Sequence, residues 1–317
     1  MSYIVLISKD YPNIAREELE RLLSVKLTPY VDGYFFTENI IDFSLVKRLG
    51  LTREIYEILD YFQTGDESAV LEKLNTGQFE NSYKIDVIGF EGITKDVKAF
   101  ADKIYHKLQS PKVDIKNPDN KYVFFWSLTE VRLAKLVFEN KDSPHDRRSH
   151  LKEHNHPTSI HPKIAKAMIN MGAKKEFLDP FCGAGGIVIE GALMGLKVKG
   201  SDIDKAMVVR AKENALAYDL DLDLEVNDAL RLTKKTECII TDLPYGKNSK
   251  ISSELVNLYC DFFAVADSLT DTIIVGSHED TDIDAYLDET NFEVYKEFPI
   301  YVHKSMTRTI SILKKMD

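Results

Sequence analysis

Asp242 begins a short run of residues with the composition of a site that acts on an aromatic amine. After an apolar stretch, its carboxylate is followed by Leu243, Pro244, Tyr245 and a glycine. An exocyclic amine is a poor nucleophile because its lone pair is delocalised into the ring. The Asp242 carboxylate and the Leu243 carbonyl can accept the amine hydrogens and localise that lone pair. Pro244 fixes the turn, and the Tyr245 ring offers a face to a flipped base. The run predicts methylation of an exocyclic amine by these four residues; the alternative is an ordinary β-turn.

A glycine-rich segment, residues 177–186, supplies a second candidate site. It contains the end of a predicted strand, a turn with Gly183 and Gly185, and the start of a predicted helix. Glycine lets the backbone turn sharply and approach a ligand closely. The spacing is neither Gly-x-Gly-x-x-Gly nor that of a P-loop, so a dinucleotide phosphate loop is disfavoured. The segment predicts a ligand-binding turn at the carboxyl end of a strand, where open α/β sheets bind their ligands.

Carboxylates also follow the next two predicted strands. Asp202 lies nineteen residues after Gly183, where an acidic residue typically holds ribose hydroxyls. Asp228 follows the strand after that. Each alone is explained equally well as an exposed turn carboxylate, and Asp204 is a predicted helix N-cap. Because the carboxyl ends of parallel strands share one edge of a sheet, Asp179, Asp202 and Asp228 together favour a binding site.

The chain after residue 158 alternates strands and helices in a way that can position such a site. Predicted strands lie at 176–179, 197–201, 222–226, 237–241 and 272–276, and predicted helices at 162–171, 184–194 and 204–218. The end of the chain, 292–314, is rich in strand-forming residues. This order predicts an α/β fold with a mostly parallel, doubly wound sheet and an antiparallel hairpin at its edge.

The first 139 residues have shorter elements and predict a separate α+β region. Strand patterns lie at 3–7, 33–36, 52–61, 83–88, 113–115 and 122–128, and helix patterns at 14–23, 43–49 and 94–108. We expect a ferredoxin-like domain at 1–60 and a second domain at 61–139. A charged linker with two prolines is expected at 140–157, followed by the domain at 158–317.

Composition and length exclude several classes of protein. The 317 residues are 44% hydrophobic and 29% charged, unlike a disordered or collagen-like chain. The longest apolar stretch, 186–198, is interrupted by Glu190 and Lys197, so no membrane span is predicted. The N-terminus lacks the basic region of a signal peptide. Three cysteines without paired spacing predict a reduced, cytoplasmic protein.

Charge is unevenly distributed along the chain. The net charge is −10, but residues 132–175, the basic belt, hold ten Lys or Arg against four Asp or Glu, a balance of +6. An acidic protein with one such belt can hold a nucleic acid there; a solvated linker is the competing interpretation. Five of the eight histidines also lie in the belt. Their irregular spacing, with no cysteine nearby, argues against zinc, and no metal is predicted.

Together these segments resemble the class I S-adenosylmethionine-dependent methyltransferases with an (Asp/Asn)-Pro-Pro-(Tyr/Phe) motif. More narrowly, the chain resembles the archaeal tRNA guanine-N2 methyltransferases that act on guanosine 10 and carry an N-terminal THUMP domain. The matching segments are residues 112–118, 156–162, 179–186, 200–204, 241–246 and 301–310. Leu243 departs from the wider Pro-Pro pattern but suits this subgroup.

The resemblance implies a fold, a cofactor and a substrate. The C-terminal half would be a Rossmann-like class I methyltransferase domain with a mostly parallel seven-stranded sheet. The N-terminal half would be a ferredoxin-like and THUMP region that grips tRNA together with the basic belt. S-adenosyl-L-methionine would be the cofactor, and the N2 amine of guanosine 10 the acceptor. The resemblance also implies which residues contact each part of the cofactor. The methionine end would be lined by Asp179, Cys182, Gly183 and Gly185, the ribose hydroxyls would be held by Asp202, and the adenine would be contacted by Asp228 and Ala229. Further cofactor contacts would come from Pro180, Ile203 and Asp242.

Other acceptors and classes stay open at this point. The same chemistry suits guanosine 6 of tRNA, an rRNA guanine or adenine N6 in DNA. An RNA-binding module without catalysis is disfavoured by the intact run at Asp242, and a nicotinamide dehydrogenase by the glycine spacing and Asp228. The sequence does not decide the number of methyl groups, the oligomeric state or the need for an accessory subunit.

Overall fold

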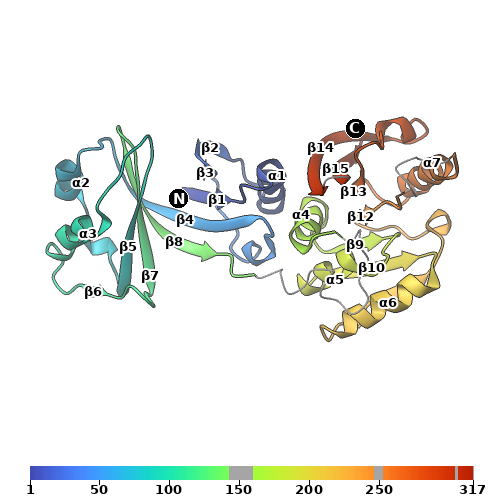
Figure 1. The fold of residues 1–317 in the computed structure, drawn as a ribbon, viewed down its shortest axis with the longest axis horizontal. Coiled ribbons are helices and arrows are strands. Elements are labelled where there is room, and N and C mark those ends of the chain that lie inside the picture. Colours follow the sequence, from blue (N-terminus) through green and yellow to red (C-terminus); the bar gives the residue numbers. More distant parts are fainter. Residues whose placement is uncertain (143–159, 246–252, 304–305, 317) are drawn as a thin grey trace. The chain divides into compact units, whose positions relative to one another are not determined.

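The computed structural model describes residues 1–142, 160–245, 253–303 and 306–316. The chain divides into two compact units, coloured along the sequence in Figure 1. The first comprises Met1–Lys9, Val25–Asp42 and Thr52–Lys141, and the second Asp10–Ser24, Phe43–Leu51 and Asp142–Asp317. Most of the predicted linker, 140–157, lies outside the described residues.

One eight-stranded sheet, ordered β2-β3-β1-β4-β8-β7-β5-β6, forms the first unit. The strands are β1 (Tyr3–Ile7), β2 (Thr28–Val31), β3 (Tyr34–Thr37), β4 (Thr52–Phe62), β5 (Ser82–Gly89), β6 (Lys112–Val113), β7 (Asn120–Trp126) and β8 (Val131–Glu139), with helices α2 (Glu67–Lys73) and α3 (Val97–Tyr105). The long strand β4 pairs with β1 and β8, so Glu57 lies opposite both Tyr3 and Lys135. The predicted boundary at residue 60 therefore falls inside a strand of a continuous sheet.

Both faces of strand β7 are buried in this unit. Phe124 and Trp126 share a core with Phe100 of α3, whereas Val123 and Phe125 belong to a second core. Since successive side chains of a strand point to opposite faces, the two cores lie on the two sides of the sheet. This explains the unbroken run of apolar residues, which shows no period-2 alternation.

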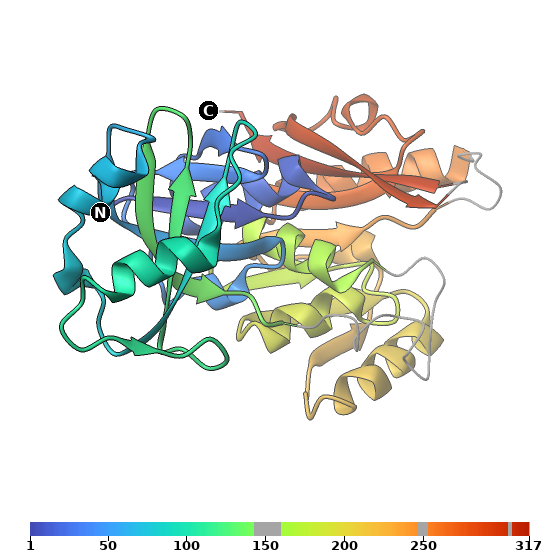
Figure 2. The same ribbon diagram turned by 60° about the vertical axis from the view of Figure 1, so that its left-hand side comes forward.

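A seven-stranded sheet, ordered β11-β10-β9-β12-β13-β15-β14, forms the second unit. The strands are β9 (Glu176–Asp179), β10 (Lys197–Asp202), β11 (Asp223–Val226), β12 (Ile239–Asp242), β13 (Thr272–His278), β14 (Phe292–His303) and β15 (Met306–Lys315). Pairing is parallel from β11 to β13, and β15 is antiparallel to both of its neighbours. Figure 2 shows the long red β14–β15 hairpin at one edge of this sheet. The predicted mostly parallel sheet with a terminal hairpin is confirmed.

Helices cover both faces of this second sheet. They are α1 (Pro12–Leu23), α4 (Pro162–Gly172), α5 (Gly186–Leu193), α6 (Lys205–Leu216) and α7 (Ser253–Asp267). Ile273 and Val275 of β13 share a core with Phe262 of α7, whereas Ile274 between them lies against Gly172 of α4. Helices α7 and α4 therefore lie on opposite faces. Among the residues that the structure describes, no helix has the length and apolar character to cross a membrane.

Helix α1 belongs to the second unit although it lies near the start of the chain. Its Glu18 side chain is fully buried. The Glu18 carboxylate accepts hydrogen bonds from the backbone nitrogens of Gly50 (2.6 Å) and Leu51 (2.9 Å) and from Nδ2 of Asn170 in α4 (2.7 Å). Burial raises the pKa of Glu18, and these hydrogen bonds oppose the rise.

Residues 43–51 are joined to α4 in the same way. The guanidinium of Arg48 donates to Oδ1 of Asn170 (3.2 Å) and to the carbonyls of Ala173 (2.7 Å) and Lys174 (3.0 Å). The helix predicted at 43–49 is only a short 3-10 turn, Val46–Arg48. Because these buried polar groups satisfy one another, both N-terminal segments are part of the packing around α4. The domain predicted at 158–317 does not include these two segments, Asp10–Ser24 and Phe43–Leu51, which belong to the second unit.

Candidate active site

A cavity of about 630 Å³ opens at the carboxyl edge of the second sheet. It is lined by the predicted residues Asp179, Pro180, Cys182, Gly183, Asp202, Ile203, Asp228, Ala229, Asp242, Leu243, Pro244 and Tyr245. Parallel strands end at the same edge, so separated segments of sequence meet there. The structure brings together every predicted site residue except Gly185; their roles stay predictions.

Gly185 does not line the cavity. It is the residue before α5, with φ of 86°, a left-handed conformation that favours glycine. A Cβ there would lie 3.1 Å from Cβ of Ala211 in α6, so Gly185 allows close packing of the turn on that helix. Gly186 lines the cavity instead. At Gly183, in contrast, no heavy atom of the described residues other than its own and those of its two chain neighbours lies within 4 Å of the Cβ position.

Asp202 at the end of β10 fixes the glycine-rich turn. Its Oδ2 accepts a hydrogen bond from the backbone nitrogen of Gly183 and its Oδ1 one from that of Asp204, both at 2.9 Å. Asp204 in turn caps α6 by accepting from Ala206 N at 2.8 Å, as predicted. Asp228 accepts from Leu230 N at 3.0 Å. Asp202 and Asp228 therefore line the cavity and also order the backbone around it.

Asp179 at the end of β9 is almost completely buried, with 1% of its surface exposed. Its Oδ1 accepts hydrogen bonds from the hydroxyl of Thr241 (2.6 Å) and from Phe181 N (3.2 Å). Burial raises the pKa of Asp179 to about 7, and the charges of Asp202 and Asp242 add to the rise. The carboxyl is therefore balanced between its two protonation states near neutral pH. Burial also raises the pKa of the Cys182 thiol above its usual range, so the thiol stays protonated.

Asp242, Tyr245 and Arg308 form a closed cluster at the end of β12. Arg308 donates from Nη2 to Oδ2 of Asp242 (3.0 Å) and from Nε to the Tyr245 hydroxyl (2.7 Å). The Tyr245 hydroxyl donates to Oδ1 of Asp242. The Arg308 side chain is 4% exposed and that of Asp242 is 19% exposed. The sequence argument did not single out Arg308, although it lies in the segment 301–310 that carries the resemblance.

Burial and ion pairing act in opposite directions on this cluster. Burial raises the pKa of Asp242, while Arg308 and the hydrogen bond from Tyr245 lower it. Burial and the Asp242 charge raise the pKa of Tyr245, which remains a neutral phenol and a hydrogen-bond donor. Arg308 thus provides the positive charge that balances a carboxylate held away from bulk water.

The structure explains leucine at position 243. Leu243 N donates to the carbonyl of Gly276 in β13 at 2.9 Å, which extends the β12–β13 pairing by one bond. Proline has no N–H and cannot make this bond. The Leu243 side chain is 1% exposed in a core that includes residues of α7. The hydroxyl of Tyr259, on α7, donates to the Pro244 carbonyl at 2.6 Å, so the turn is fixed from both sides.

The basic belt is divided between the two units, and its residues 143–159, which include four of its histidines, lie outside the described residues. Arg132 of the first unit forms an ion pair with Glu130, and the buried Lys166 of the second with Asp142 at 2.8 Å. Within the described ranges, no three His, Cys, Asp or Glu residues are grouped to hold a metal ion.

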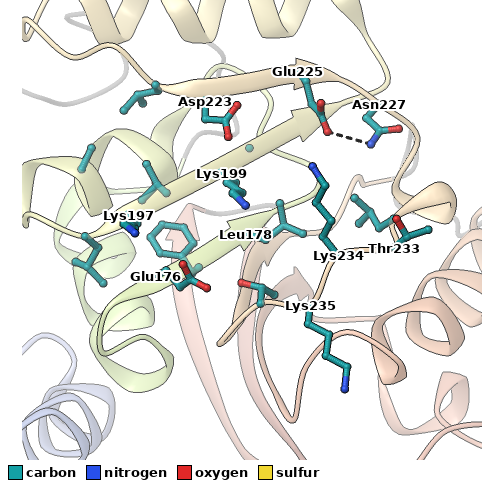
Figure 3. Close-up of a pocket in the computed structure, with 18 of the residues that line it drawn as sticks. Glu176, Leu178, Lys197, Lys199, Asp223, Glu225, Asn227, Thr233, Lys234 and Lys235 are labelled. Carbon is teal, nitrogen blue, oxygen red and sulfur yellow. Dashed lines mark hydrogen bonds between the residues drawn. The ribbon is translucent and has the colours of Figure 1, made fainter.

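A second hollow, of about 700 Å³, lies beside β9, β10 and β11 (Figure 3). Charged side chains of both signs line it, including Lys197, Lys199, Lys234, Asp223 and Glu225. Between β11 and β12 the chain forms only a short 3-10 turn, Ala229–Arg231, which leaves this part of the sheet uncovered by that connection. None of the predicted site residues lines the hollow, whereas all of them except Gly185 line the smaller cavity.

The comparisons with known proteins point to methyl transfer. Residues 149–309 match the family model UPF0020, described as RMKL-like, methyltransferase domain. The tRNA (guanine(10)-N2)-dimethyltransferase of Methanothermobacter thermautotrophicus is 28% identical, over 100% of both chains. The protein of the same name from Pyrococcus abyssi is 26% identical over 96% of both. These relatives confirm the resemblance to the archaeal tRNA guanine-N2 methyltransferases, while the THUMP domain stays a prediction.

The solved structures agree on the fold. The crystal structure of TrmN from Thermus thermophilus covers 100% of both chains with a TM-score of 0.54 at 17% identity. A possible methylase from Clostridium difficile 630 gives a TM-score of 0.52 at 16% identity over 100% of this chain and 99% of that one. The predicted α/β fold of the methyltransferase type is thereby confirmed.

Proposed function

Because the chain belongs to the UPF0020 family of RMKL-like methyltransferase domains, we propose that it transfers methyl from S-adenosyl-L-methionine to the N2 amine of guanosine 10 in tRNA. One observation carries the proposal. The chain matches a tRNA (guanine(10)-N2)-dimethyltransferase along the full length of both proteins. The cavity that holds Asp242 and Tyr245 supplies the polar and aromatic groups that such an acceptor needs.

The residues of the cavity fit S-adenosylmethionine. The Cβ position of Gly183 is open, which leaves room for a ligand against the backbone. Asp202 and Asp228 provide carboxylates for ribose hydroxyls and the adenine at the ends of adjacent strands. Asp179, with its pKa of about 7, ionises when a cation comes near. When bound, this cofactor supplies an electrophilic methyl group on a sulfonium.

The acceptor base is held by the last residue of β12 and by the residues that follow it. Asp242 accepts hydrogen bonds from the guanine amine, together with the Leu243 carbonyl, and thereby localises its lone pair. The Tyr245 ring stacks on the flipped base. Leu243 and Pro244 are held in place by Gly276 and Tyr259, so the groups are positioned before the substrate arrives. Catalysis then depends on orientation and on polar contacts aimed at the reacting amine.

Binding of the tRNA is assigned to the first unit and the basic belt. In this proposal the ferredoxin-like and THUMP regions of residues 1–139 grip the tRNA, and the protein acts in the cytoplasm. Support comes from the full-length relatives, which match this region as well as the catalytic unit. A tRNA (guanine(6)-N2)-methyltransferase from Methanocaldococcus jannaschii matches only 49% of this chain at 27% identity, which favours position 10.

The test uses the full-length protein, labelled S-adenosylmethionine and tRNA transcripts. A transcript with guanosine at position 10 is compared with matched transcripts in which guanosine 10 or guanosine 6 is replaced by adenosine. We expect N2-methylguanosine in the nucleoside digest, lost only with the position-10 replacement. Loss only with the position-6 replacement moves the reaction to guanosine 6, and no methylation of any transcript refutes the proposal.

A further inference from the structure

Arg308 reaches Asp242 from a strand that does not adjoin β12. In the sheet order, β13 lies between β12 and β15. Asp242 is paired with Gly276 of β13, and Arg308 is paired with His278 of the same strand. The guanidinium nevertheless lies 3.0 Å from Oδ2 of Asp242. The ion pair therefore crosses β13.

Gly276 makes this crossing possible. A Cβ on Gly276 would overlap Oδ1 of Asp242, so the carboxylate occupies the space that any other side chain would fill. The φ of Gly276 is not in the left-handed region. The need for glycine is therefore one of space and not of backbone conformation. Alanine at this position forces the Asp242 carboxylate to move.

The direction of the hydrogen bonds orders the cluster. Arginine only donates, so the Tyr245 oxygen accepts from Nε of Arg308 and its hydroxyl hydrogen is directed to Asp242. Each Asp242 oxygen accepts one of these bonds and retains a lone pair. The Arg308 guanidinium also lies 5.6 Å from the Tyr245 ring centroid, so one residue restrains both the carboxylate and the ring.

We propose that Arg308 is a positioning residue, which with the space left by Gly276 holds the Asp242 carboxylate and the Tyr245 ring in place for the acceptor base. The inference rests on the proposed function, in which these two groups hold the guanine. It assigns a part in the reaction to β13 and β15. It also predicts that rate, more than binding, depends on Arg308.

Other charged and titratable groups surround the cluster and must be considered in any pH dependence. Asp179 of β9 interacts electrostatically with Asp242, and Tyr259 of α7 does so too. The His278 ring of β13 lies 6.3 Å from that of Tyr245, and its Nδ1 is 3.4 Å from Asp280. These groups are unchanged in an Arg308 variant. A shift of the pH profile in Arg308→Gln that is absent in Arg308→Lys therefore reports the loss of the positive charge beside Asp242.

The test measures single-turnover methylation of the tRNA transcript against pH in Arg308→Gln, Arg308→Lys and Gly276→Ala. Lys314→Gln is the matched control, since Lys314 is a cation of β15 that lies over the Tyr295 ring. We expect Arg308→Gln to lose roughly 10²-fold in rate, the scale for misplacing a reacting group by about 1 Å. On the acidic side of the pH profile, the rate of this variant should fall off at a higher pH than that of the wild-type protein, because the Arg308 charge lowers the pKa of Asp242. Arg308→Lys should restore the wild-type pH profile but not the full rate, because a lysine cannot bond both groups in a planar fork.

A second readout does not require activity. The carboxyl carbon of Asp242, assigned by its absence in Asp242→Asn, is titrated by NMR in the wild-type protein and in Arg308→Lys and Arg308→Gln. Titration of Asp242 at the same pH in the wild-type protein and a folded Arg308→Gln overturns the proposal, as does an unchanged rate profile. If Arg308→Gln does not fold, a wild-type rate in Arg308→Lys and Gly276→Ala overturns it. A wild-type protein that methylates no tRNA refutes the proposed function instead, and the titration then decides the inference.

Discussion

Replacing Asp202 by alanine separates its two roles in a measurable way. The carboxylate accepts 2.9 Å hydrogen bonds from Gly183 and Asp204 and lines the cavity where the cofactor ribose is proposed to lie. A hydrogen bond to a charged group contributes about 1.5–3 kcal/mol. Loss of one such cofactor contact weakens binding by about 12- to 140-fold. Loosening of the turn at Gly183 adds to that loss.

Calorimetry with S-adenosylmethionine measures the Kd of Asp202→Ala, Asp202→Asn and the wild-type protein. The asparagine keeps one acceptor oxygen and should fall between the other two. Asp223→Ala is the matched control, because Asp223 is an exposed carboxylate on the neighbouring strand β11 and lies outside the cavity. Thermal unfolding checks that each variant is folded. An unchanged Kd in a folded Asp202→Ala refutes the assignment of Asp202 to the cofactor.

Three further predictions follow from the same contacts. Burial raises the folded-state pKa of Asp179 to about 7, so its contribution to stability is present at low pH and is lost as the pH rises through 7. The fall in Tm between pH 5 and pH 8 should be smaller in Asp179→Asn than in the wild-type protein; equal falls contradict this. A chain of residues 155–317 lacks α1 and the Arg48 segment, and should show no cooperative melting; wild-type melting and cofactor binding would show that α4 does not need them. Leu243→Pro removes the hydrogen bond to the Gly276 carbonyl. Because that buried carbonyl then has no partner, the free energy of unfolding measured in urea should fall by about 1 kcal/mol or more. An unchanged urea midpoint would show that this hydrogen bond does not stabilise the fold.

Local signals in the sequence predicted much of the catalytic unit. The strand patterns predicted at 176–179, 197–201 and 237–241 correspond to β9, β10 and β12, which end at Asp179, Asp202 and Asp242. The order of elements then predicted that these strand ends share one edge of the sheet. Asp202, Asp228 and Asp242 line one cavity for that reason. The predicted cap at Asp204 was correct because capping depends on the first turn of one helix alone.

Contacts between distant segments were not predictable in this way. Arg308 meets Asp242 across β13, and nothing in a run of alternating strand residues marks one arginine as buried and paired. Gly276 resembles any strand glycine until the carboxylate beside it is seen. Helix α1 packs in the second unit through contacts such as the hydrogen bond between Glu18 and Asn170, two residues far apart in the sequence. The packing of Gly185 on Ala211 was equally hidden, because two glycines in one turn look alike in the sequence and differ only in the atoms that surround them.

Single-turnover methyl transfer by Asp242→Ala tests the central claim most directly. The variant is measured with saturating tRNA and S-adenosylmethionine, beside Asp242→Asn, which keeps the size of the side chain near the buried Arg308. If Asp242 holds the guanine amine, its contribution appears in the transition state more than in binding. We predict a rate reduced by roughly 10²-fold or more, with the affinity for tRNA and cofactor little changed. A near wild-type rate in folded Asp242→Ala would contradict the account and leave Asp242 as a residue of the turn.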